Sequence, residues 1–168
     1  MTWDDAYLNN TTPWEKDAPQ VLNWLPDLKE GSVLELGCGT GVYSEFLNKR
    51  GLKVTGLDSS EIAIRKARIR VPEAKFELFD LNHLEEYNAG KFDLILDVKT
   101  LAFLDDEQKY LRVVRNLLKE DGYFILQIFS KHIRSELVAK STSFPFTIKD
   151  CRQTVMGDTE MTTYFFQL

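Results

Sequence analysis

Short apolar runs alternate with longer amphipathic stretches along most of this 168-residue sequence. Short apolar runs are typical of strands, and the stretches between them carry apolar residues at helical spacing. The runs predict strands at residues 32–36, 52–57, 75–79, 92–97 and 122–129. Because strands separated by helices pair in parallel through right-handed crossovers, the pattern predicts an α/β fold with a doubly wound (Rossmann-like), mostly parallel sheet and helices on both faces.

Helix boundaries follow from capping residues. The helix after the second strand is predicted to begin at Ser60, a residue type that caps helix N-termini, and to end before Pro72. The most regular amphipathic stretch, residues 105–121, is predicted to be one helix, with Gly122 just past its end.

The last segment breaks the alternation of strands and helices. Residues 144–168 predict two strands around Gly157 and Asp158, a hairpin that adds antiparallel strands to the sheet. A helix beginning at Thr147 is the alternative interpretation. The whole chain, residues 1–168, is predicted to be a single domain.

Composition narrows the classes of partner. The net charge of -5 argues against nucleic acid, and the one dense basic run, Arg65 to Arg70, is interpreted as a solvated helix face. The two cysteines, Cys38 and Cys151, and the two histidines lack metal-ligand spacing, so we expect no metal. Without a leader or a membrane-length apolar run, a cytoplasmic protein that does not bind membranes is expected.

Three glycines follow the first predicted strand in the stretch "ELGCGTG", at Gly37, Gly39 and Gly41. A dinucleotide-binding turn has its third glycine one residue later, where this chain has Val42, and a Walker loop needs a Lys that is absent here. The turn lies at the carboxyl end of a strand, where open parallel sheets bind ligands. The spacing therefore favours a ligand other than NAD or ATP.

Acidic residues at neighbouring strand ends indicate which chemical groups that ligand carries. Asp58 ends the second strand, where a carboxylate can bind both hydroxyls of a ribose, although it is also a candidate helix cap. Asp80 can accept an adenine amine, while the backbone of Leu81 meets the ring edge. Glu35 either orients the turn or meets an ammonium group. Adenosine without phosphates, joined to a cationic amino-acid arm, fits this set.

Several motifs together resemble the class I S-adenosylmethionine-dependent methyltransferases. They are "VLELGCGTG", "VTGLDSSEIAIRKAR", "FELFDL", "FDLILD" and "LLKEDGYFIL", and the resemblance covers residues 32–130. The leading "TWDDAYLNNTTPWEKDAPQVLNWL" is similar to the branch that contains thiopurine, halide, thiol and tellurite-resistance methyltransferases. One departure is "LDVKTLAFL", where heteroatom-methylating relatives have "LDRG".

The resemblance implies roles for particular residues. S-adenosylmethionine is the implied cofactor, bound by the glycine turn, by Asp58 with Ser59, and by Asp80 with Leu81. Asp97 ends the fourth strand and matches the position that faces the methionine amine or the substrate, so it is the one catalytic candidate; its alternative is a helix cap.

Aromatic side chains are candidates for contacts with the cofactor and the acceptor. Trp14 is predicted to meet the sulfonium, because an aromatic face stabilises a nearby cation. Tyr7, Tyr43 and Phe103 are candidates for an apolar substrate mouth. For Tyr7 and Trp14 the alternative is that they pack an N-terminal helix over the sheet.

The predicted function is methyl transfer to a small nucleophile of the thiol, selenium or tellurium oxyanion, or halide type. The alternatives are a protein lysine methyltransferase, with a protein as substrate, and a non-catalytic subunit that binds the cofactor or a partner. Residues 1–30 are predicted to cap the cofactor, residues 31–130 to form the cofactor-binding core, and residues 131–168 to supply the C-terminal strands.

Overall fold

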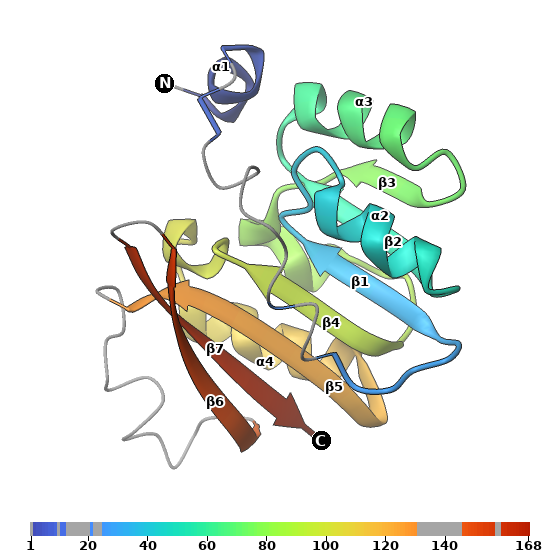
Figure 1. The fold of residues 1–168 in the computed structure, drawn as a ribbon, viewed down its shortest axis with the longest axis vertical. Helices are drawn as coiled ribbons and strands as arrows, with labels where there is room; N and C mark the ends of the chain where they lie inside the picture. The colour runs from blue at the N-terminus through green and yellow to red at the C-terminus, as the bar shows by residue number, and fades with distance from the viewer. Residues whose placement is uncertain (1, 10, 13–20, 22–24, 131–145, 157–158) are drawn as a thin grey trace. The chain divides into compact units, whose positions relative to one another are not determined.

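A computed structural model describes residues 2–9, 11–12, 21, 25–130, 146–156 and 159–168. The chain forms two compact units, Met1–Leu81 and Asn82–Leu168. Figure 1 shows the helices and strands of both. In the described part of the chain, no helix combines the length and the apolar character that crossing a membrane requires.

The first unit consists of alternating strands and helices. They are α1 (Trp3–Leu8), β1 (Ser32–Leu36), α2 (Val42–Lys49), β2 (Lys53–Asp58), α3 (Glu61–Arg70) and β3 (Lys75–Leu78). The strands lie in the order β3-β2-β1 and pair in parallel. The three strands predicted in this unit are confirmed, with boundaries that differ by at most one residue at either end.

Local chemistry explains where α3 begins and how it packs. Ser60 is its N-cap, as predicted, and its hydroxyl accepts a hydrogen bond from the amide of Ala63 at 3.1 Å. Cys38, Ile64, Ala67, Val71 and Phe76 form a buried apolar cluster between helix and sheet.

Gly56 of β2 lies against that cluster. A Cβ at this position would stand 2.7 Å from the Phe76 ring, closer than side-chain packing allows. Cys38 is buried in the same cluster and acts as a small filler.

The second unit continues with strands of both orientations. The 3₁₀ helix η3 (Leu81–Glu86) leads into it, followed by β4 (Phe92–Val98), η4 (Leu101–Phe103), α4 (Glu107–Leu117), β5 (Leu118–Phe129), β6 (Thr147–Met156) and β7 (Thr159–Gln167). Its strands lie in the order β4-β5-β7-β6. β4 and β5 pair in parallel, whereas β7 is antiparallel to both β5 and β6.

The predicted end of the long helix is wrong. α4 ends at Leu117, and β5 begins at once with Leu118, which pairs with Phe92. The pairing then shifts register before Tyr123, and Gly122 lies in this irregular stretch, where a Cβ would stand 2.9 Å from a backbone oxygen. Apolar spacing alone places Leu118 on the helix stripe, because a buried sheet position and a buried helix position both select leucine.

The C-terminal hairpin is confirmed, and the alternative of a helix from Thr147 is wrong. β6 and β7 pair over their whole length, from Thr147 opposite Gln167 to Met156 opposite Thr159. Phe124 of β5 stacks on Phe166 of β7 with ring centroids 5.5 Å apart, so aromatic packing joins the antiparallel strands to the parallel pair.

Candidate functional site

The glycine turn leaves β1 in a conformation that only glycine adopts without strain. The φ angles of Gly37, Gly39 and Gly41 are 73°, 52° and 79°. Gly41 begins α2 in the left-handed region, and a Cβ there would lie 3.2 Å from the Cβ of Ala67 in α3. The turn therefore presents bare backbone and packs closely on the neighbouring helix.

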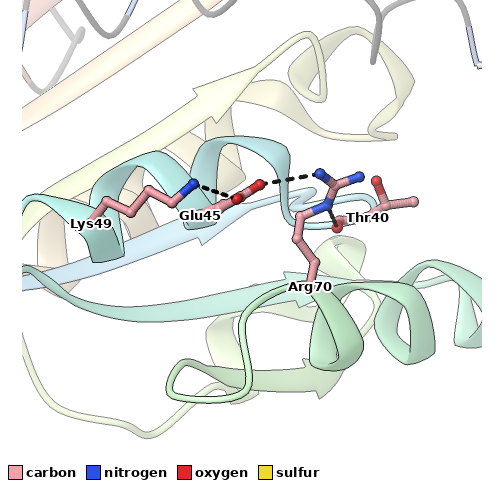
Figure 2. A network of polar contacts seen from close by, with 4 residues as sticks. All are labelled: Thr40, Glu45, Lys49 and Arg70. Carbon is pink, nitrogen blue, oxygen red and sulfur yellow. Dashed lines mark hydrogen bonds and ion pairs between the residues drawn. The ribbon is translucent and has the colours of Figure 1, made fainter.

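Two sets of backbone contacts hold the turn in place. The amides of Gly37 and Cys38 both donate to the carbonyl of Leu57, at 2.8 and 2.9 Å. On the other side, Arg70 at the end of α3 donates to the carbonyl of Thr40 at 2.9 Å and forms an ion pair with Glu45, which also binds Lys49 (Figure 2). Arg70, the last residue of the basic run that was interpreted as a solvated helix face, thus supports the glycine turn.

Asp58 is oriented by the turn that it faces. Its two oxygens accept hydrogen bonds from the amides of Gly39 and Ser60, both at 2.9 Å, and the side chain is 7% exposed. Ser60 supplies the side-chain cap of α3, so capping does not account for the contact between Asp58 and Gly39. An ionised carboxylate only accepts hydrogen bonds, and these two amides fix the direction of the Asp58 side chain.

The predicted adenine-binding residues lie at the neighbouring strand end. In the sheet register Asp58 is opposite Leu78, and Asp80 follows two residues later. Asp80 and Ser59 are exposed, whereas Leu81 is buried. The structure therefore brings Asp58 and Asp80 to one edge of the parallel strands, as the sequence predicts.

Glu35 lies beneath the turn and has a local partner. It is buried on β1 and accepts a hydrogen bond from the hydroxyl of Ser44 in the first turn of α2. Burial, aided by the nearby charge of Asp58, raises the pKa of Glu35 from 4.5 to about 8. Glu35 is therefore mostly protonated at neutral pH, and the contact with Ser44 favours its role in orienting the turn.

The aromatic candidates occupy different environments. Tyr7 is buried in α1, and Tyr43 is half-buried in the first turn of α2. Phe103, in the second unit, is 54% exposed on η4. Trp14 lies outside the described residues.

Asp97, at the end of β4, organises the segment that follows. It is fully buried and accepts hydrogen bonds from the Tyr110 hydroxyl at 2.7 Å and the Thr100 amide at 3.0 Å. Burial raises its pKa from 3.8 to about 6. The N-cap of α4 is Asp106 instead, so Asp97 does not cap that helix and holds the chain between β4 and η4.

Lys99 was missed by sequence reasoning. It is 8% exposed, its φ is 70°, and its amide donates to the carbonyl of Gln127 at 2.8 Å. A side chain other than glycine in this region is strained, and such strain is concentrated at functional positions. The sequence signal was the "LDVKTLAFL" departure, which shows the lysine but not its backbone conformation.

Comparison with known families gives one match over most of the chain. A family model described as "Methyltransferase domain" matches residues 27–166. Proteins named "Ubiquinone biosynthesis O-methyltransferase" are similar: that of Acinetobacter baylyi is 24% identical over 82% of this chain, and that of Pseudomonas aeruginosa 27% identical over 72%. The chain spans 61% and 55% of those relatives.

Solved structures resemble most of the chain. A TehB-like SAM-dependent methyltransferase from Corynebacterium glutamicum has a TM-score of 0.78 at 20% identity, with 96% of this chain and 97% of that chain covered. The N-methyltransferase NodS from Bradyrhizobium japonicum, in complex with S-adenosyl-l-homocysteine, has a TM-score of 0.66 at 19% identity, with 81% and 76% covered. These likenesses confirm the predicted fold class.

Proposed function

The chain belongs to the S-adenosylmethionine-dependent methyltransferase family, and we propose that it transfers the methyl group to a small anionic nucleophile: a thiolate, a selenium or tellurium oxyanion, or a halide. The observation that carries the acceptor class is Lys99, a buried lysine with a strained backbone directly after β4. Ligands of open parallel sheets bind at the carboxyl ends of the strands, and Lys99 directly follows the end of β4.

The residues of the first unit fit the cofactor by their chemistry. Asp58 is an acceptor-only group, held by two amides, and a ribose diol offers two donors. Asp80 supplies a second acceptor, which is exposed, just after the adjacent strand end, where it suits an adenine amine. The turn from Gly37 to Gly41 supplies close backbone approach for the amino-acid arm.

Methyl transfer requires the protein mainly to align the acceptor with the cofactor and to exclude water. When bound, S-adenosylmethionine supplies an electrophilic methyl group on a sulfonium. An acceptor that is already anionic needs no general base, so the task of this chain is to bind the acceptor and orient it for in-line displacement. In this proposal Lys99 attracts the acceptor, and Asp97 positions the backbone that carries Lys99.

The segment after β4 supports a small acceptor. Between β4 and α4 the chain contains a single 3₁₀ turn, Leu101–Phe103, which leaves little material for recognising a large substrate. The N-terminal resemblance to thiol, halide and tellurite-resistance methyltransferases points to the same acceptors.

A hydroxyl acceptor is the second candidate, because the similar curated proteins are named as O-methyltransferases. A protein lysine acceptor and a non-catalytic partner role remain as further alternatives.

An acceptor panel tests the proposal. We expect release of S-adenosylhomocysteine above the no-acceptor control with thiols, selenite, tellurite or iodide. Lys99→Met should raise KM for the active anion by about tenfold and leave cofactor affinity unchanged, since one buried charge contact is worth about 1.5 kcal/mol.

Three outcomes would assign the function differently. Release with a catechol alone would favour O-methylation, and label transferred only to lysate protein would favour a protein substrate. Tight cofactor binding with no release for any acceptor would favour the non-catalytic subunit.

Replacing Asp97 should affect turnover more than binding. In Asp97→Asn the amide NH₂ faces the Thr100 amide or the Tyr110 hydroxyl, so the segment carrying Lys99 loosens. We expect kcat to fall about tenfold or more and the Kd of the cofactor to change less than about threefold. Tyr110→Phe removes one hydrogen-bond donor to Asp97 and should lower kcat by a smaller factor. If Asp97→Asn and Asp58→Ala lost cofactor affinity equally, the assignment of turnover to Asp97 and of cofactor binding to Asp58 would be contradicted.

A further inference from the structure

The N-terminal helix α1 is tied to the candidate cofactor site by side chains far apart in sequence. Asp4 of α1 accepts hydrogen bonds from the Ser60 hydroxyl at 2.5 Å and from the Ile62 amide at 3.2 Å. These contacts lower the pKa of Asp4, so the carboxylate is ionised at neutral pH. Asp4 thus acts as a second cap on the N-terminus of α3, supplied from another element.

A second contact fixes the other end of α1. Lys66 of α3 donates to the carbonyl of Tyr7 at 2.7 Å, and Tyr7 is buried. α1 has only six residues, too few to be stable as a helix by itself. Its position on α3 (Figure 1, blue and green) therefore depends on Asp4, Lys66 and the burial of its apolar face.

Ser60 connects this attachment to Asp58. The Ser60 hydroxyl binds Asp4, whereas the Ser60 amide donates to Asp58, and Asp58 in turn accepts from the amide of Gly39. Ser60 is 1% exposed and Asp58 7%, so water does not easily replace the contact between these two residues, whereas Asp4 is half-buried. One chain of hydrogen bonds therefore runs from α1 to the glycine turn.

We propose that Asp4 is a positioning residue for the cofactor and that α1 is a clasp whose attachment to α3 is coupled to occupancy of the Asp58 site. The proposal rests on the proposed function. A ligand that holds Asp58 also holds Ser60, which favours attachment of α1. By linkage, detaching α1 weakens ligand binding by the same factor.

Hydrogen exchange and calorimetry on the full chain test the clasp. In Asp4→Ala without cofactor, we expect exchange of the Ile62 amide and of α1 to accelerate about tenfold or more, because a hydrogen bond to a charged group is lost. S-adenosylhomocysteine should slow α1 exchange in the wild type. Its Kd should rise about fivefold in Asp4→Ala, the lower end of typical coupling.

Matched variants separate coupling from general loss of stability. Lys66→Met should accelerate exchange only near the end of α1 that contains Tyr7 and leave Ile62 protected, because Asp4 still holds the other end of α1 on α3. Asp106→Ala removes the aspartate cap of α4 and should change neither α1 exchange nor Kd.

The outcomes distinguish this proposal from the proposed function. Wild-type binding with equal Kd and equal α1 exchange in Asp4→Ala would overturn the clasp and leave the cofactor assignment intact. No binding by the wild type would overturn the cofactor assignment and with it the coupling, while faster Ile62 exchange in Asp4→Ala would still establish the attachment of α1.

Discussion

Asp58→Ala is expected to raise the Kd of S-adenosylmethionine by about 100-fold, because two hydrogen bonds to a charged acceptor are each worth about 1.5–3 kcal/mol. The loss is direct, since the carboxylate is the proposed ribose acceptor. It is also indirect, since the amides of Gly39 and Ser60 lose the group that orients the turn. Titration calorimetry with S-adenosylhomocysteine measures the change.

The control for Asp58→Ala is another aspartate that accepts from a backbone amide. Asp106 accepts from the Lys109 amide at 2.9 Å, and Asp106→Ala should cost about 1 kcal/mol of stability while leaving the Kd unchanged. Both variants should be compared well below their melting temperatures. A less than threefold change in Kd for Asp58→Ala would remove Asp58 from the cofactor site.

The second large effect concerns Glu35 and pH. The unfolded chain loses the Glu35 proton near 4.5, whereas the folded protein keeps it until about pH 8. Between these values the folded state binds more protons, so the free energy of unfolding falls as pH rises, by at most about 1.4 kcal/mol per pH unit. Glu35→Gln has no proton to lose and keeps an acceptor for Ser44.

We therefore expect Glu35→Gln to gain about 2–4 kcal/mol of stability relative to the wild type between pH 5 and pH 8. Urea unfolding of both proteins across this range measures the difference, and subtraction removes the contribution of Asp97, which titrates in both. Parallel stability curves would contradict the prediction.

Glu45→Gln is the matched control for this measurement. The pKa of Glu45 is lowered by Lys49 and Arg70, so Glu45 contributes stability above its unfolded pKa that is lost as pH falls. Between pH 5 and pH 8 it is ionised in both the folded and the unfolded chain. Its replacement should shift the curve without changing its slope in this window.

The arrangement at the glycine turn was determined largely by the sequence itself. Gly37, Gly39 and Gly41 are local in the chain, and their positive φ angles follow from residue type. Asp58 and Asp80 end predicted strands, and parallel pairing brings such ends to one edge. Periodicity and sheet rules therefore sufficed to place the predicted cofactor residues at one edge of the sheet.

Only the tertiary structure decided which partners these residues have. Three hydrogen bonds join side chains of different elements, and the way the elements pack on one another determines them. They are Ser44 to Glu35, Tyr110 to Asp97 and Ser60 to Asp4. The sequence contains each residue but no signal that pairs them. The tertiary structure also decided where α4 ends, because Leu118 pairs with Phe92 and is therefore part of β5.

The sequence by itself determined the fold class and the residues of the glycine turn, because these depend on periodicity and on short-range spacing, and its family motifs implied the cofactor. Tertiary structure decided the protonation of Glu35 and Asp97, which depends on burial, and the strained backbone of Lys99, which depends on its contact with Gln127. It also decided the attachment of α1 through Asp4, because Asp4 and Ser60 are 56 residues apart in sequence and come into contact only in the folded protein.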